Sequence, residues 1–242
     1  MYKSQHYKFI TTPLSKILED GVNACRGIGS GIETYPLCDY IMQSIFLKMT
    51  GAQEQKMKCI CWEMATNDYE YRYEYLNKKN YGEHSDYNSK NNIYKDLIKQ
   101  IPQFDIDVIT ANVEDIKNIV LNILDNPNLL RVAQQESFIY FMSDYEKVLK
   151  NTQIKQKQGD TYLLFQSDLH KSYDEIVYKH RNRCAHNLTS YQQDLPTLST
   201  LANPDYIYHN YFFRFAILIL IDEIFISLYK KYVEVLENNI NW

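Results

Sequence analysis

The stretch from Phe212 to Ile226 is apolar at almost every position, and only Arg214, Asp222 and Glu223 carry a charge within it. It is shorter than the about 20 apolar residues that a helix needs to span a bilayer. We therefore expect a buried core helix, part of a helix that runs from Tyr206 to about Leu236 and closes a helical bundle with its apolar side. Asp222 and Glu223 are expected to meet a partner subunit or a basic motif, or to mark the exposed edge of this helix.

Few residues in the chain favour tight turns. The 242 residues include 7 Gly and 6 Pro, which argues against a β architecture with many turns. A hydrophobic fraction of 45% and a charged fraction of 23% are typical of a globular protein. We predict an all-α fold, an up-and-down helical bundle with extra N-terminal and inserted helices. Residues 1–36 are predicted to form an N-terminal extension, and residues 37–242 the main helical domain.

In several segments apolar residues recur every three or four positions, which is the spacing of an amphipathic helix. The residues Thr50 and Gly51 are predicted to separate the first two of these helices. The polar segment at about 77–92 is predicted to be a mobile loop, and the segment at about 151–160 a connection or the tip of a hairpin. The predicted helices that precede the C-terminal one span residues 37–49, 52–76, 93–101, 113–124, 128–149 and 161–186.

The charge balance limits the kinds of partner that the chain can have. A net charge of −4 and a pI near 5.9 exclude a protein that coats nucleic acid with its whole surface. An enzyme that acts at one phosphodiester needs only a local positive site. The five cysteines lack the spacing of zinc ligands, and their odd number favours reduced thiols in a cytosol. We expect no metal, no cofactor, no membrane contact and, because no signal peptide is recognised, a cytoplasmic location.

The run Arg181-Asn182-Arg183-Cys184-Ala185-His186 combines a phosphate-binding group with a proton-transfer group. In a helix, Asn182 and His186 lie one above the other, and Arg181 flanks the same edge, so one phosphodiester could touch all three. The guanidinium of Arg181 can bind phosphate oxygens with two hydrogen bonds and offset charge on a pentacoordinate phosphorus. Histidine, with an ordinary pKa of about 6.5, can take or give a proton near neutrality. The plainer alternative is that the arginines are solvated and His186 caps a helix C-terminus.

The helix that carries this run is predicted to have two stripes. One, facing the core, contains Leu169, Tyr173, Ile176, His180 and Cys184, and a neighbouring one contains Asp174, Tyr178, Asn182 and His186. We interpret the second stripe as the active face. Tyr178, Lys179 and Arg183 are candidates for substrate binding, with packing or a solvated helix face as the alternative. Much earlier in the chain, Glu54, Lys56 and Lys58 could approach the site, but an exposed charged face is the simpler interpretation.

The pattern Arg-Asn-x-x-x-His at 181–186, in its helical context, resembles the signature of the HEPN superfamily (higher eukaryotes and prokaryotes nucleotide-binding), and the Cys-Ala-His spelling is most similar to its abortive-infection branch. The resemblance covers about residues 161–238. It implies an all-helical domain, usually a homodimer in which two motifs meet across the interface. It also implies a metal-independent endoribonuclease that leaves a 2′,3′-cyclic phosphate and a 5′-hydroxyl. Arg181 and His186 would be the catalytic pair and Asn182 the supporting polar residue.

Three functions therefore remain open for the chain. The first is an endoribonuclease with an RNA substrate, acting in bacterial anti-phage defence or a toxin–antitoxin system, with an antitoxin or another regulatory partner to restrain it. The second is a catalytically silent helical module for binding or dimerisation, which the lack of a broad basic surface favours. The third is a nucleotide sensor that uses Arg181 to hold a mononucleotide phosphate. The defence role rests on family analogy alone.

Overall fold

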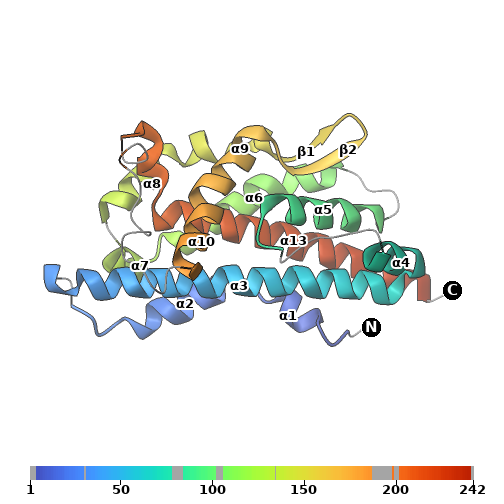
Figure 1. The fold of residues 1–242 in the computed structure, drawn as a ribbon, viewed down its shortest axis with the longest axis horizontal. Helices are drawn as coiled ribbons and strands as arrows, with labels where there is room; N and C mark the ends of the chain where they lie inside the picture. The colour runs from blue at the N-terminus through green and yellow to red at the C-terminus, as the bar shows by residue number, and fades with distance from the viewer. Residues whose placement is uncertain are drawn as a thin grey trace.

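The computed structural model describes residues 4–29, 31–77, 84–101, 106–133, 135–186, 198 and 202–240. Within these ranges nearly all secondary structure is helical, and the predicted all-α class is confirmed (Figure 1). The α-helices are α1 (Tyr7–Thr11), α2 (Ser15–Ala24), α3 (Tyr35–Asn67), α4 (Tyr69–Asn77), α5 (Tyr87–Lys99), α6 (Ile106–Leu124), α7 (Pro127–Val132), α8 (Gln135–Val148), α9 (Ser167–Ser172), α10 (Lys179–His186) and α13 (Tyr211–Ile240). Short helical turns lie at η1 (Ile32–Thr34), η2 (Asn151–Gln153) and η4 (Pro204–Tyr208), a π-helical segment at η3 (Tyr173–Tyr178), and strands at β1 (Ile154–Gln158) and β2 (Thr161–Phe165).

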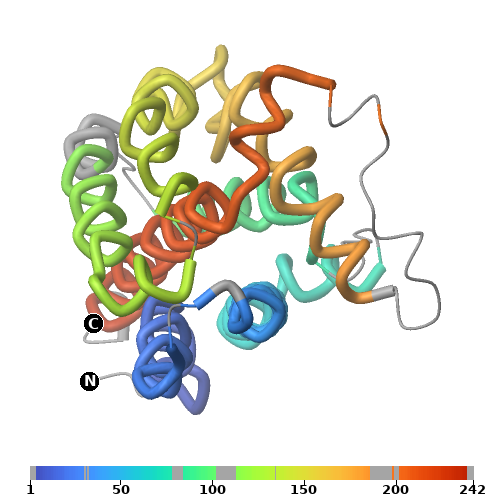
Figure 2. Tube along the Cα trace, turned by 90° about the vertical axis from the view of Figure 1, so that its left-hand side faces the viewer, coloured from blue at the N-terminus to red at the C-terminus, as the bar shows by residue number. Residues whose placement is uncertain are grey.

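Helix α13 is the centre of the molecule. Figure 2 shows it in the middle, with the other helices around it, and it contacts α1, α3, α5, α6, α8 and η3. From Phe212 to Phe225 almost every side chain is fully buried. This confirms the predicted core helix. No helix in the described ranges has the length and apolar character that crossing a membrane requires.

Helix α3 runs without interruption through the predicted break at Thr50 and Gly51, so the prediction of two separate helices was wrong. A glycine inside a helix costs about 1 kcal/mol relative to alanine, which is a weak local signal. Burial of Met49, Met57 and Ile60, each fully inaccessible to solvent, outweighs it. The apolar packing of the long helix therefore decides its continuity.

Lys56 and Asp222 form a buried ion pair that joins α3 to α13. Lys56 Nζ donates to Asp222 Oδ1 over 2.7 Å, with side-chain exposures of 4% and 1%. The Leu14 backbone N–H donates to Asp222 Oδ2 over 2.7 Å, and Lys56 also donates to the Thr12 carbonyl. The interpretation of Lys56 as an exposed charge was therefore wrong, because its tertiary partner was not visible in the sequence. Asp222 does not mark an exposed edge of α13 either, and its basic partner is Lys56 of α3 rather than the motif at 181–186.

The same ion pair holds the N-terminal residues against the bundle. Ile10, Leu14, Leu18 and Val22 are buried, and α1 and α2 contact α3. Burial of these apolar side chains and the two polar contacts at Asp222 stabilise the same interface. The described part of residues 1–36 thus contributes to the core of the helical bundle.

A β-hairpin precedes the motif helix. Strands β1 and β2 are antiparallel, with Ile154 opposite Phe165, and Gly159 at the turn has a positive φ of 59°. Of the two alternatives for residues 151–160, a connection or the tip of a hairpin, the structure has a hairpin, but only 159–160 form its turn and 154–158 are strand β1. Residues 161–165 are strand rather than the start of the helix. Tyr87 on α5 explains this, because its hydroxyl donates to the Phe165 carbonyl and accepts from the Phe165 N–H. A distant helix thus fixes the strand.

The segment predicted as a mobile loop is partly helical. Helix α5 begins at Tyr87, and Asp86 caps it by accepting a hydrogen bond from the Ser89 N–H over 2.8 Å. Residues 78–83 lie outside the described residues. The helix predicted at 128–149 is broken between α7 and α8, where Ala133 has an extended backbone. Residues 188–197 of the predicted loop before α13 also lie outside the described part.

The motif helix changes its pitch before the motif. After α9, residues Tyr173–Tyr178 form a π-helical segment, and α10 then resumes the α-helix. Leu169, Tyr173 and Ile176 are buried as predicted. A π-helical turn holds more residues than an α-helical turn, so the faces of α9 and α10 are out of phase. The predicted stripes, which assume one α-helix throughout, therefore do not continue across this segment.

Replacing Asp222 by Ala is expected to lower the free energy of unfolding by about 3–5 kcal/mol, because Lys56 would remain charged and unpaired in the core. The double variant Lys56→Met with Asp222→Leu should recover most of this loss. Urea denaturation measures both. The matched control is Lys16→Ala, which removes the exposed Lys16–Asp20 pair and should change stability by less than about 1 kcal/mol. If Asp222→Ala lowered the free energy of unfolding by as little as the control does, the role of the buried pair would be contradicted.

Candidate functional site

Arg181 and Asn182 lie together on α10, next to α3. Arg181 Nη1 donates to Asn182 Oδ1 over 3.2 Å, and Arg181 Nη2 lies 3.1 Å from Glu54 Oε1. The two side chains of this ion pair are 18% and 11% exposed. His186 is the last residue of α10, and its side chain lies outside the described part of the structure. The structure thus brings together two of the three predicted catalytic residues and adds Glu54.

Glu54 faces a second cation, Lys90 of α5. Lys90 is almost fully buried, donates to the His84 and Ser85 carbonyls, and lies over the ring of Tyr173, 5.6 Å from its centroid. Burial is the main cause that lowers the pKa of Lys90 to about 8. The carboxylate of Glu54 raises this pKa, and the charge of Arg181 lowers it further. The carboxylate of Glu54 therefore partly compensates two cations in a site with little water.

This ion pair and Lys90 border a cavity of about 10 Å³, room for about one water molecule. Tyr178 also lines it, one turn from Arg181. The interpretation of Glu54 as an exposed charge was wrong, and Lys90 was hidden in the predicted loop. The sequence carried one signal that Lys90 lies on a helix, the helix cap Asp86-x-x-Ser89, which marks the start of α5.

The predicted substrate-binding residues Tyr178, Lys179 and Arg183 do not lie together. Tyr178 faces the small cavity beside Arg181. Lys179 is on the surface and forms a 2.6 Å ion pair with Glu175. Arg183 lines a separate, larger cavity on another face of α10. The six-residue motif therefore contributes to two different environments.

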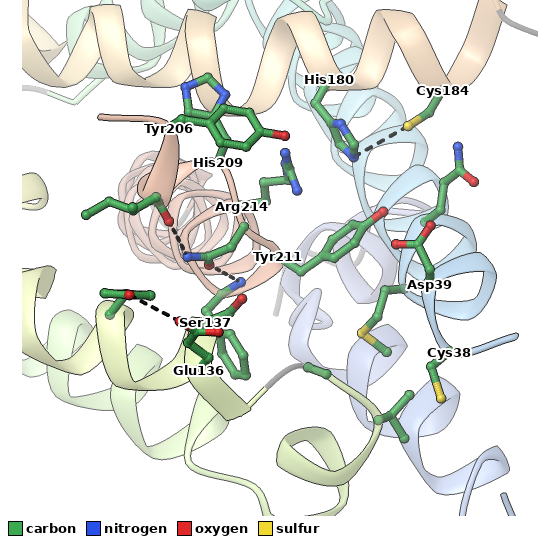
Figure 3. A pocket seen from close by; sticks show the side chains of 18 of the residues that line it. Cys38, Asp39, Glu136, Ser137, His180, Cys184, Tyr206, His209, Tyr211 and Arg214 are labelled. Carbon is green, nitrogen blue, oxygen red and sulfur yellow. Dashed lines mark hydrogen bonds between the residues drawn. The ribbon is translucent and has the colours of Figure 1, made fainter. Parts of the chain in front are cut away.

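The larger cavity has a volume of about 850 Å³ and lies between α3, α8, α10 and the start of α13 (Figure 3). The side chains of His180 and Cys184 enter it from α10, with 3.5 Å between His180 Nε2 and Cys184 Sγ. His180 also packs against the rings of Phe46 and Tyr211. The predicted core positions His180 and Cys184 thus line a cavity rather than solid core.

Positive charge is concentrated around this cavity. Burial lowers the pKa of His180 to about 2, and Arg214, Arg183 and His209 lower it further in the same direction. Burial likewise lowers the pKa of His209, with Arg214 and Arg183 contributing. Both imidazoles are therefore neutral at pH 7, mainly because they are buried and also because two arginines lie beside them.

Among the described residues, no group of three or more His, Cys, Asp or Glu side chains is arranged to hold a metal ion. The five cysteines are free thiols. Cys25 and Cys59 have a raised pKa, mainly because burial disfavours the thiolate.

Acidification is expected to destabilise the protein. The pKa of His180 is about 2 in the folded chain and about 6.5 when unfolded, so between these values only the unfolded chain binds the proton. Its contribution to stability is complete above the unfolded pKa and declines as the pH falls below it. From about pH 7.5 to about pH 5 the loss from this one residue is about 2 kcal/mol.

Urea denaturation at the two pH values, for the wild type and for His180→Gln, measures this loss. For each protein, the free energy of unfolding at about pH 5 is compared with its own value at about pH 7.5. The wild type should lose more stability between these two pH values than His180→Gln does. The stability of the variant will still depend partly on pH, because other buried histidines remain, such as His84, whose pKa is lowered to about 4 mainly by burial. An identical pH dependence of the two proteins would contradict the assignment to His180.

Comparison of the chain with protein-family models, with curated proteins and with solved structures found no match. The resemblance to the HEPN signature therefore stays a prediction from residues 181–186 and their helical context. The site consists of Arg181 and Asn182 in contact on α10, an ion pair between Arg181 and Glu54 of α3, and two cavities on different faces of the motif helix.

Proposed function

We propose that the chain is a metal-independent endoribonuclease that cleaves RNA by attack of a ribose 2′-hydroxyl on the adjacent phosphodiester. The observation that carries this proposal is the arrangement of Arg181, whose guanidinium contacts Asn182 and is held by Glu54 in a mostly buried ion pair. A solvated surface arginine would not be oriented in this way. An oriented guanidinium is the group that best stabilises the negative charge of a pentacoordinate phosphorus.

The proposed reaction assigns one role to each motif residue. His186 takes the proton of the 2′-hydroxyl and gives it to the leaving 5′-oxygen. The 2′-oxygen forms a bond to phosphorus as the bond from phosphorus to the 5′-oxygen breaks, and the products are a 2′,3′-cyclic phosphate and a 5′-hydroxyl. Arg181 binds the non-bridging oxygens, and Asn182 supplies a hydrogen bond to the imidazole or to a ribose hydroxyl. Glu54 positions the guanidinium of Arg181.

The biological setting is proposed from the family resemblance. A homodimer would bring two copies of the motif to one composite site. The enzyme would act in the cytoplasm during phage infection or as the toxin of a toxin–antitoxin system, and an antitoxin or another regulatory partner would restrain it.

One observation favours a second candidate, a catalytically silent module. The carboxylate of Glu54 already neutralises Arg181. An arginine paired in this way serves equally well as a structural contact between α3 and α10. In that case the chain would keep the helical bundle and its binding surfaces without cutting RNA.

Cleavage assays separate the two candidates. Purified protein is incubated in EDTA with total bacterial RNA and with a tRNA pool, beside Arg181→Ala, His186→Ala and Asn182→Ala, and the fragment ends are identified. Loss of Arg181 or His186 should lower the rate by at least about 10²-fold, since general acid–base catalysis contributes about 10²–10⁴. Fragments should end in a cyclic phosphate.

The control variant is Lys231→Ala, which removes an exposed charge paired with Glu234 far along α13 and should cleave as the wild type does. A second informative variant is Glu54→Gln, which should cleave more slowly than the wild type but faster than Arg181→Ala, because the guanidinium remains while its positioning carboxylate is lost. Intact RNA with a folded dimer, or full activity in His186→Ala, would reject the nuclease and favour the silent module.

A further inference from the structure

The charge of Arg214 on α13 is buried without an anion beside it. The residue is 5% exposed, its Nε donates to the Ile176 carbonyl over 3.1 Å, and its guanidinium lies 5.0 Å from the centroid of the Tyr211 ring. Within the described part of the chain it forms no ion pair with a carboxylate. An unpaired buried charge is strongly unfavourable. The pKa of Arg214 accordingly falls to about 10, with burial as the main cause.

The guanidinium of Arg214 is directed into the 850 Å³ cavity (Figure 3). A guanidinium has several N–H donors, and only Nε is used by the Ile176 carbonyl. Arg183 of α10 lines the same cavity, and its side chain has no hydrogen-bond or ion-pair partner among the described residues. Two arginines from different helices therefore present unused donors to the same cavity.

Two histidines add to this donor set. His180 and His209 both line the cavity, and the pKa of each imidazole is lowered by burial and then by the two arginines. The Nδ1 atom of His209 is buried and has no hydrogen-bond partner in the described structure. An anion at the centre of this cluster would relieve the repulsion between the cations and satisfy the unpaired nitrogen.

The acidic groups at the cavity do not fill this role. Asp39 of α3 and Glu136 of α8 line it, but neither forms an ion pair with Arg214 or Arg183 in the described structure. Burial raises the pKa of Asp39 and Arg214 lowers it, so Asp39 senses the arginine without contacting it. Glu136 accepts a hydrogen bond from the Tyr140 hydroxyl instead. The positive cluster thus remains uncompensated.

The size and lining of the cavity fit more than an inorganic ion. Small-molecule sites occupy about 300–1,000 Å³, and this cavity falls in that range. Aromatic rings line the same cavity: Tyr206 stacks on His209, with 5.3 Å between the ring centroids and 27° between the rings, and Tyr211 lies under the guanidinium of Arg214. Flat aromatic faces of this kind stack on a planar ring of a ligand.

We propose that this cavity binds a phosphorylated small molecule, with the phosphoryl oxygens accepting hydrogen bonds from Arg214, Arg183 and His209 and a planar ring resting against the tyrosines. The site is separate from the Arg181–Glu54 pair, and the proposal does not depend on RNA cleavage. Arginine suits the role because its planar donors match the geometry of phosphate oxygens.

Isothermal titration calorimetry with inorganic phosphate, adenosine monophosphate and adenosine tests the proposal in a chloride buffer. We expect one ligand per chain, adenosine monophosphate binding more tightly than phosphate, and adenosine binding at least about tenfold more weakly than its monophosphate because the charge-assisted hydrogen bonds are lost. Binding of phosphate with no gain from the nucleoside would identify a free phosphate ion as the ligand. No binding of either phosphate compound up to about 10 mM, or equal binding of adenosine and its monophosphate, would overturn the proposal.

Variants locate the site. Arg214→Lys and Arg183→Gln should each weaken ligand binding by about ten- to hundredfold. If Arg214→Lys fails to fold, Arg183→Gln still tests the proposal, because Arg183 is only half-buried. The matched control is Arg72→Gln, an exposed arginine on α4, with an expected change below about twofold. Arg181→Gln should also bind normally. Loss of binding in Arg181→Gln with normal binding in Arg183→Gln would place the phosphate at the motif and overturn the proposal.

Discussion

Helix α13 has no solvent-facing side from Phe212 to Asp222, and α1, α3, α5, α6, α8 and η3 pack around it. This constraint also fixes where charge can go. Asp222 is buried, and it is stabilised by Lys56 from α3 and by the Leu14 N–H from the N-terminal residues. Arg214 is buried too, but among the described residues its partners are the Ile176 carbonyl and the ring of Tyr211. One helix thus accounts both for the buried ion pair with α3 and for the buried cation at the large cavity that forms no ion pair among the described residues.

Much of the fold could be predicted from local patterns, and the errors have a common cause. The apolar run at Phe212–Ile226 was enough to predict a core helix, and the polar segment at 151–160 was enough to predict a break between helices, with a hairpin as one of two alternatives. The break at Gly51 and the helix at 161–165 were wrong because distant residues decide both: the apolar packing of α3, and the hydrogen bonds of Tyr87 to Phe165. Local propensity is a weak signal where tertiary contacts are strong.

The candidate site was predictable only in part, for the same reason. The neighbouring positions of Arg181 and Asn182 follow from the sequence, and the structure places their side chains in contact. The partner Glu54 lies 127 residues away along the chain, and Lys90 lies in a segment whose helix cap was overlooked. Arg214 was visible as a charge within an apolar run, but its relation to Arg183 and the histidines required the packing of α10 against α13.

The π-helical segment Tyr173–Tyr178 has a consequence for how relatives of this chain can be recognised. A π-helical turn is equivalent to one additional residue in an α-helix, so the faces before and after it are offset by about 100°. A relative that lacks the extra residue would present the same motif with a one-residue gap and an unbroken helical repeat. An alignment that treats residues 167–186 as one continuous helical repeat, with no gap allowed at 173–178, would therefore pair the cavity-lining face of one protein with the motif face of the other.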